Sequence, residues 1–373
     1  MEKIHGVNLG NWLVLEKWMD IRIFENTGAD DEIWLSRKLD RETLHKKVKE
    51  HRDTFITERD FQNIASHGVN LVRIPVPYFI FGDREPLPGG IEYLDKAFDW
   101  ANQYGLQILL DLHTVPGSQN GYDNGGITGV CKWSKSPEEV EFALSVLERL
   151  ATRYGDNEAL YGIQPLNEPI SFLVWVTSPS FNKALDKDEA KGSSYVSMSF
   201  LKGFYLKAYK RLREILPEDK VIVFHDGFRL KKWKKFFTEN NLKNVMLDTH
   251  IYIFAMEGFL PIPSFRVYKA YVNMNKRTIR KVASYVPVVV GEWCISNKYA
   301  GNAESNKKQE KYRQVADLQL KAWDESAGFI YWSYKLWPEN DIPMDEDWKE
   351  AWDLRRDWER GYMPGDFKTL CYK

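Results

Sequence analysis

Eight short apolar runs, separated by stretches with helical spacing, most strongly constrain the fold of this 373-residue chain. We expect strands at Gly6–Leu9, Val69–Pro75, Gln107–Leu112, Leu160–Pro165, Val221–His225, Val245–Ile251, Val286–Gly291 and Gly328–Tyr334. Between or after them we expect helices at Thr57–His67, Leu94–Tyr104, Pro137–Tyr154, Phe200–Leu216, Ser305–Asp324 and Trp348–Arg360. Such alternation is typical of a parallel sheet with right-handed crossovers, and eight units can close into a barrel.

The predicted fold class is therefore α/β: a single (β/α)8 TIM barrel that forms one catalytic domain over residues 1–373. An open doubly wound sheet is the alternative, but no Gly-rich dinucleotide fingerprint follows the first expected strand. Three segments after expected strands are too long for tight connections: Thr114–Trp133, Ser171–Val196 and Phe254–Phe265. We expect these long βα-loop insertions to build the walls and rim of a pocket.

Composition excludes several classes of protein. The chain has 52 basic and 53 acidic residues, and this balance argues against nucleic-acid binding. Its three cysteines include no CxxC pair, so neither a disulfide framework nor a zinc site is indicated. No stretch is apolar enough to span a membrane, and no secretion signal is visible at the start. We therefore expect a cytoplasmic protein, although a trimmed secreted chain would look the same.

Unusual polar and aromatic residues fall near the ends of the expected strands. In barrel enzymes the chemistry lies at the C-terminal ends of the strands. Candidate site residues at these positions are Arg73, His113, Asn167, Glu168, His250, Tyr252, Glu292 and Trp332. We expect them to meet at one end of the barrel.

Two glutamates from distant parts of the chain are the candidate catalytic pair. Glu168 follows one buried run and Glu292 ends another. A lone glutamate after a strand is more often a helix-starting or solvated acid. An acid at the end of a fully buried strand, however, needs partners or a chemical role. Together the two fit the proton donor and the nucleophile of glycosidic-bond hydrolysis.

The basic side chains near the strands have competing interpretations. Arg73 inside an apolar strand is either a structural ion-pair member or a partner that keeps Glu292 ionised. His113 and His250 would each pass for core histidines, but at strand ends they favour hydrogen bonds to sugar hydroxyls and carboxylates. No spacing of histidines suggests a metal. The basic run from Arg229 to Lys235 is interpreted as a solvated helix face rather than a phosphate site.

Five segments resemble glycoside hydrolase family 5, and especially its exo-β-1,3-glucanase branch. They are Gly6–Glu16, Asp111–Asn124, Asn167–Pro169, His250–Tyr252 and Gly291–Trp293. The resemblance extends to about residue 334, and the remainder matches less well. It implies a barrel enzyme that hydrolyses β-glycosides with retention of configuration and needs no metal or organic cofactor.

The resemblance also implies a role for each matching residue. Glu168 would be the acid/base, Glu292 the nucleophile, and Asn167 a partner of the sugar 2-hydroxyl. The remaining residues would surround the reacting sugar: Arg73, His113, His250 and Tyr252 beside the carboxylates, Trp332 beneath the ring, and Glu16, Asp123 and Asn124 at its far hydroxyls. Tyr122 fits one side of an aromatic clamp at the entrance, whereas the other side aligns with Ala255, beside Phe254.

The expected function is that of a retaining exo-acting β-glycosidase. It would resemble a β-glucosidase or exo-β-1,3-glucanase and would release a terminal sugar from small oligosaccharides or glycosides. An intracellular β-mannosidase or a diglycosidase is the alternative, with an endo-β-glucanase or a non-catalytic sugar-binding barrel less favoured. We expect an ionised Glu292 and a protonated Glu168, with carboxyl groups about 5–5.5 Å apart. Sugar epimer, linkage and oligomeric state stay open.

Overall fold

Eight parallel strands form a closed barrel in chain order in the computed structural model, which describes residues 2–258, 263–336 and 349–370. The strands are β1 (Ile4–Asn8), β2 (Leu71–Val76), β3 (Gln107–Leu112), β4 (Leu160–Gln164), β5 (Val221–His225), β6 (Val245–His250), β7 (Val288–Glu292) and β8 (Gly328–Tyr331). Because β1 pairs with both β2 and β8, the first and last strands close the barrel. The predicted (β/α)8 fold is confirmed.

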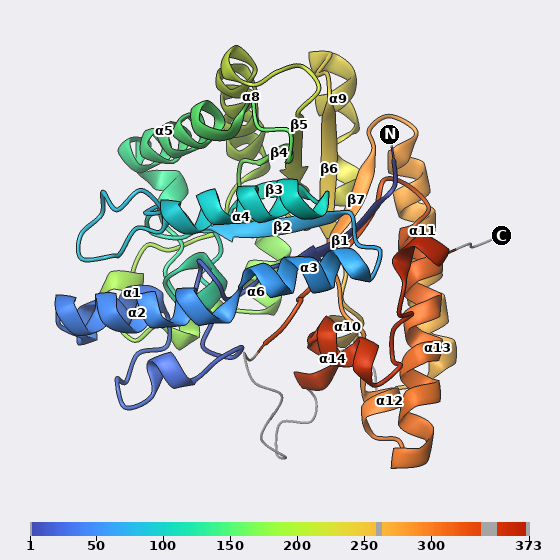
Figure 1. The fold of residues 1–373 in the computed structure, drawn as a ribbon. Coiled ribbons are helices and arrows are strands. Elements are labelled where there is room, and N and C mark those ends of the chain that lie inside the picture. The colour runs from blue at the N-terminus through green and yellow to red at the C-terminus, as the bar shows by residue number, and fades with distance from the viewer. Residues whose placement is uncertain (1, 259–262, 337–348, 371–373) are drawn as a thin grey trace.

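Long helices surround the barrel (Figure 1). They are α2 (Arg41–Phe55), α3 (Glu58–Ser66), α4 (Ile91–Tyr104), α5 (Pro137–Tyr154), α8 (Met198–Ile215), α11 (Phe265–Ala283) and α13 (Ser305–Trp323). In α5, for example, Ser136 caps the N-terminus, Pro137 begins the helix, and Val140, Leu144 and Leu147 recur on the buried face. The sequence analysis had left α2 and α11 unassigned.

Shorter elements lie in the loops. The helices are α1 (Glu32–Lys38), α6 (Phe172–Thr177), α7 (Lys187–Ala190), α9 (Lys234–Asn240), α10 (Ile253–Glu257), α12 (Lys298–Gly301) and α14 (Leu354–Glu359). The 3-10 turns are η1 (Arg22–Phe24), η2 (Asp123–Gly125), η3 (Trp133–Lys135), η4 (Ser180–Lys183), η5 (Leu230–Lys232) and η7 (Phe367–Thr369). The predicted insertions follow β3, β4 and β6, as expected, although residues 259–262 lie outside the described residues.

Two local predictions need correction. The helix expected over Trp348–Arg360 begins only at Leu354, because the buried Asp353 side chain accepts the Arg356 amide as an N-cap; Trp348 lies outside the described residues. The basic run is not one helix face, since Trp233 is fully buried and donates to the Asp226 carbonyl, 2.9 Å away. Its four lysines are nevertheless exposed, as a solvated run requires.

The barrel interior changes from apolar to polar along the strands. Near the beginning of the strands, Leu71, Leu109 and Met246 belong to one apolar cluster. Alternate strand residues share a face, so the next inward positions are two residues further on. Three of those positions carry buried charges: Arg73, Asp111 and Asp248. A layer of buried polar side chains therefore lies above this apolar cluster, at the C-terminal ends of the strands.

Among the described residues, no helix combines the length and apolar character needed to cross a membrane. Cys131 and Cys294 are buried and unpaired.

Candidate active site

The guanidinium of Arg73 lies at the centre of the polar layer. Its Nε donates to Gln164 Oε1 at 2.9 Å, and Nη2 donates to Asn167 Oδ1 at 2.8 Å. Nη1 donates to Asn8 Oδ1 at 2.8 Å and to Glu292 Oε1 at 2.9 Å. Arg73 has no exposed surface. The predicted pairing of Arg73 with Glu292 is therefore confirmed. Arg73 also donates to acceptors on two further strands, β1 and β4.

A second chain of contacts fixes Asn167. Asp111 Oδ2 lies 3.0 Å from Arg73 Nη2 and 2.5 Å from Nδ1 of His113. Because Asn167 Oδ1 accepts from Arg73, its amide nitrogen is the group 3.3 Å from His113 Nε2. This pattern makes His113 neutral, with its proton on Nδ1, and burial lowers its pKa accordingly. His113 thus orients Asn167 as well as facing the site.

Asp248 joins β6 to β4 and β7. Its carboxylate accepts Gln164 Nε2 at 2.7 Å and the Gly291 amide at 2.8 Å, and it contacts His250 Nε2 at 3.1 Å. Gly291 permits this approach, since a Cβ there would lie 2.1 Å from Asp248 Oδ1. Sequence reasoning missed Asp248, Gln164 and Asn8. The signal was available: Asp248 lies two residues before His250 on the same strand face.

His250 brings the two candidate catalytic carboxylates together. Its Nδ1 lies 2.7 Å from Glu168 Oε1 and 3.2 Å from Glu292 Oε2. Burial works against charge on the ring, but the negative charges of Glu292 and Asp248 raise the pKa of His250 well above its usual value. We conclude that His250 is an imidazolium that donates from both ring nitrogens.

The two carboxylates face each other across a short gap. Because one nitrogen contacts an oxygen of each, the separation of those oxygens cannot exceed the sum of 2.7 and 3.2 Å. That limit is below the roughly 6.5–9.5 Å of inverting glycosidases and is compatible with the roughly 5–5.5 Å of retaining ones. The structure therefore places Glu168 and Glu292 as the sequence predicts.

Burial and the charge of His250 act in opposite directions on the pKa values of the two carboxyl groups. Burial raises the pKa of Glu292 to about 7, despite His250, Arg73 and the Tyr252 hydroxyl at 2.9 Å. Burial also opposes charge on Glu168, but the hydrogen bond and charge of His250 outweigh it and bring that pKa to about 2. Arg73, Tyr252 and the His250 imidazolium all donate to Glu292, as they would to a carboxylate, so the proton is assigned to the coupled pair and not to one residue. The expected ionised Glu292 and protonated Glu168 stay a prediction. Below pH about 7 the pair holds one proton.

The buried Glu16 and the half-buried Asp123 form an acidic end to the site. Glu16 Oε2 accepts the Trp18 indole N–H at 2.8 Å, while Oε1 is buried with no hydrogen-bond partner among the described residues. Burial and the charge of Asp123 raise the pKa of Glu16, and burial raises the pKa of Asp123 to about 6. Glu16 Oε1 therefore retains acceptor capacity that a sugar hydroxyl can fill. Asn124 differs from expectation, since its amide donates to Glu168 Oε2 at 3.0 Å.

Aromatic residues line the rest of the site. The Trp332 ring stacks on His113 with centroids 5.6 Å apart. At the entrance, the Tyr122 hydroxyl donates to the Ser178 carbonyl at 3.2 Å. Phe254 is exposed and packs against Tyr252 with centroids 5.2 Å apart. Phe254 therefore supplies an aromatic ring near the aligned Ala255 position.

Glu168, His225 and His250 form a group with the geometry of a potential metal site, since one ligand atom from each lies within 4.8 Å of the others. The sequence had suggested no metal. His225 Nδ1 accepts the Gly227 amide at 3.0 Å, so in neutral His225 the proton is on Nε2. Burial lowers the pKa of His225 to about 3. A protonated His250 and an Nε2–H on His225 present donors rather than metal ligands.

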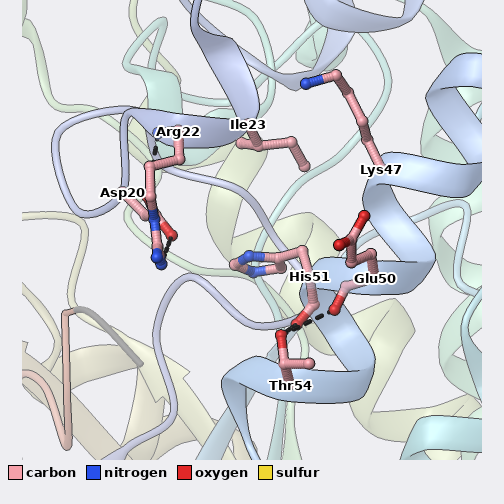
Figure 2. Close-up of a pocket in the computed structure, with 7 residues that line it drawn as sticks. All are labelled: Asp20, Arg22, Ile23, Lys47, Glu50, His51 and Thr54. Carbon is pink, nitrogen blue, oxygen red and sulfur yellow. Dashed lines mark hydrogen bonds and ion pairs between the residues drawn. The ribbon is translucent and has the colours of Figure 1, made fainter. Parts of the chain in front are cut away.

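A separate pocket of about 390 Å³ lies between residues 20–23 and helix α2 (Figure 2). Its lining includes Asp20, Arg22 and His51, but none of the predicted site residues. His51 Nε2 contacts the Asn11 carbonyl at 2.6 Å, and Asn11 Oδ1 accepts the Glu16 amide at 2.8 Å. His51, which lines this pocket, is therefore linked to the Glu16 backbone through Asn11.

The chain matches the family model for cellulase (glycosyl hydrolase family 5) over residues 41–337. It is 33% identical to the probable glucan 1,3-beta-glucosidase A of Emericella nidulans, over 90% of this chain and 85% of the relative. It is 30% identical to the glucan 1,3-beta-glucosidase of Blumeria graminis, over 90% and 82%.

Solved structures show the same fold at lower sequence identity. Rutinosidase from Aspergillus niger superposes with a TM-score of 0.75 at 23% identity, covering 96% of this chain and 97% of that one. Thermotoga maritima Cel5A, solved with cellobiose, gives 0.54 at 17% identity, covering 93% and 96%.

A closed parallel barrel with two buried glutamates facing each other at the ends of β4 and β7 defines the chain as a glycosyl hydrolase. More particularly, it belongs to glycosyl hydrolase family 5.

Proposed function

We propose that this protein is a retaining, exo-acting β-glycosidase that releases a terminal sugar from β-linked oligosaccharides or glycosides by double displacement. One observation carries the proposal: Glu168 and Glu292 both contact Nδ1 of His250. The names of the relatives, glucan 1,3-beta-glucosidases, support a β-glucosyl substrate.

In the first step the Glu292 carboxylate attacks the anomeric carbon while Glu168 protonates the departing oxygen. The proton of the pair must therefore be on Glu168 when the leaving oxygen departs. His250 can supply it, since its Nδ1–H lies 2.7 Å from Glu168 Oε1 and the ring becomes neutral when that proton is transferred. Arg73 at 2.9 Å and the Tyr252 hydroxyl at 2.9 Å then stabilise the charge on Glu292.

In the second step water attacks the glycosyl–Glu292 ester, and Glu168 accepts the proton of that water. The bond to Glu292 breaks, the sugar leaves with its original configuration, and the pair again holds one proton. Asn167 lies between Arg73 and His113, where its orientation is fixed for a sugar hydroxyl. The acidic end formed by Glu16 and Asp123 favours removal of a terminal unit.

One observation favours a diglycosidase as the second candidate. A pocket of about 400 Å³ shares Asp123 with the site and is also lined by Trp18, Tyr122 and Thr128. Its aromatic rings and hydroxyls suit a sugar. A substrate with a second sugar in this pocket would release a disaccharide. Chromatography of the products separates the two candidates.

The decisive experiment is a panel of aryl β-glucoside, β-mannoside, β-xyloside and β-galactoside substrates. Glu292→Gln should reduce the best turnover by at least about a thousandfold, because the nucleophile is lost. Glu32→Gln is the matched control, since Glu32 is buried outside the site, and it should retain activity. Near-wild-type turnover by folded Glu292→Gln would refute the proposed function.

A further inference from the structure

An unusual number of exposed apolar side chains gathers in the loop after β4. Helix α6 has no buried residue, and the exposed fractions are 58% for Phe172, 66% for Leu173 and 49% for Val176. Phe181, Leu185 and Tyr195 in the same loop are also exposed. Contiguous apolar surface of this kind commonly marks a binding site.

This surface, which we call the α6 face (Phe172, Leu173, Val176 and Phe181), is internally ordered. The Phe172 ring packs edge-on against Tyr195 with centroids 5.2 Å apart. Trp175 packs against Phe181 at the same centroid distance of 5.2 Å. The face is therefore built by ring contacts within the loop, although nothing in the described residues covers its outer side.

Residues at both ends of α6 are hydrogen-bonded to the loop after β3, and Asn124 of that loop contacts Glu168. Before the helix, the Ile170 amide donates to the Gln119 carbonyl at 3.1 Å. After it, the Ser178 carbonyl accepts the Tyr122 hydroxyl at 3.2 Å. Asn124, two residues after Tyr122, donates to Glu168 at 3.0 Å. The α6 face is thus part of the rim next to the proton donor.

The chemistry of the proposed reaction identifies what meets this rim. A proton donor must face the oxygen that joins the sugar to its aglycone, while the nucleophile attacks the anomeric carbon from the opposite side. The aglycone therefore extends outward past Glu168, where the chain runs directly into α6. Phe254, which packs against Tyr252 beside Glu292, adds a further exposed aromatic ring.

We propose that the α6 face is an aglycone-binding surface and that the natural substrates are β-glycosides of large apolar aglycones. The proposal rests on the proposed function and on the continuity of the α6 face with Glu168. Burial of an alkyl chain or flat ring system on Phe172, Leu173 and Val176 would add binding energy on the leaving-group side of the reaction.

The test compares octyl and methyl glycosides of the sugar that the aryl panel identifies, with the octyl compound below its micelle concentration. Wild-type enzyme should show a higher kcat/KM for the octyl glycoside. In Leu173→Ser/Val176→Ser, and separately in Phe172→Ser, the octyl-to-methyl ratio should fall by roughly tenfold, which corresponds to about 55 Å² of apolar burial. The ratio does not depend on the fraction of folded enzyme.

Met274→Ser is the matched control, because Met274 is 55% exposed on α11 and is far along the chain from the β4 loop. It should leave both the ratio and the basal activity unchanged. An unchanged ratio in the α6 variants would overturn the proposal. So would a loss of vesicle binding or of dimer formation without a change in the ratio, because the face would then serve a membrane or a second copy. If wild-type enzyme hydrolyses no glycoside at all, the proposed function itself fails.

Discussion

Nδ1 of His250 is the atom on which the protonation of the site depends. It contacts both candidate catalytic carboxylates, and its shorter contact, at 2.7 Å, is with Glu168. Protonation of the pair is therefore a property of three groups together and not of one glutamate. Two residue-scale predictions follow from this arrangement.

The first prediction concerns pH. Burial raises the pKa of Glu292 to about 7, so the pair keeps its proton below that pH and loses it above. We expect kcat/KM to fall about tenfold per pH unit above pH 7, since this parameter reports the free enzyme. Tyr252→Phe removes a hydrogen bond that lowers the Glu292 pKa, so the falling limb should move to higher pH. Tyr104→Phe, remote from the site, should not move it; a downward shift in Tyr252→Phe would contradict this assignment.

The second prediction concerns the leaving group. Glu168→Ala removes the proton donor, so substrates with poor leaving groups should lose about a hundredfold to ten-thousandfold in rate. Dinitrophenyl glycosides need no protonation, and their first step should be largely spared. Burst kinetics with both kinds of substrate measure this difference. An equal loss for both would exclude an acid/base role for Glu168.

At the scale of elements, the close approach of β6 and β7 depends on Gly291. A Cβ there would lie 2.1 Å from Asp248 Oδ1, so Gly291→Ala must displace that carboxylate. We expect a loss of about 1–3 kcal/mol in the free energy of unfolding, together with reduced activity. Gly203→Ala in α8 is the opposite control: its Cβ meets nothing within 4 Å, and helix propensity predicts a small gain. Urea denaturation of both variants gives the comparison, and equal stability would disprove the steric argument.

The elements differed in how far the sequence could predict them. β3, at Gln107–Leu112, and β5, at Val221–His225, were predicted to the residue, because short apolar runs bounded by polar residues define buried strands. The start of α14 was wrong, because it depends on Asp353, a cap that is recognised only by its contact with Arg356. Spacing along the chain does not reveal such contacts.

The residues of the candidate site also differ in how far the sequence could predict them. Glu168, Glu292 and Arg73 could be located because charges stand out in apolar strands. Asp248 could have been found from its place two residues before His250, but the contact of Asp248 with Gln164 crosses strands and is not visible in the sequence. How the proton is shared between the two glutamates depends on distances from one histidine nitrogen, which no motif encodes.

At the scale of the whole molecule, a buried ion pair connects the end of the barrel to its beginning. Lys335, just after β8, contacts both Asp60 oxygens at 2.9 and 3.0 Å, and Asp60 also caps α3. Both side chains are buried. The pair therefore joins segments separated by most of the chain.

Lys335→Met should destabilise the fold by about 3–5 kcal/mol, because it leaves the buried Asp60 charge without its partner. Lys191→Met removes an exposed pair with Asp188 and should cause no measurable change. Thermal and urea unfolding measure both variants. If Lys335→Met were as stable as Lys191→Met, the Lys335–Asp60 pair would not stabilise the contact between the two ends of the barrel.

The contacts of Arg73 have a consequence for attempts to change what this enzyme cleaves. One cation binds acceptors contributed by β1, β3, β4 and β7, so any shift of it moves four strands at once. Engineers should therefore leave it as a fixed reference point. New substrate ranges are better sought by changing the loops after the strands, because these can vary without moving Arg73.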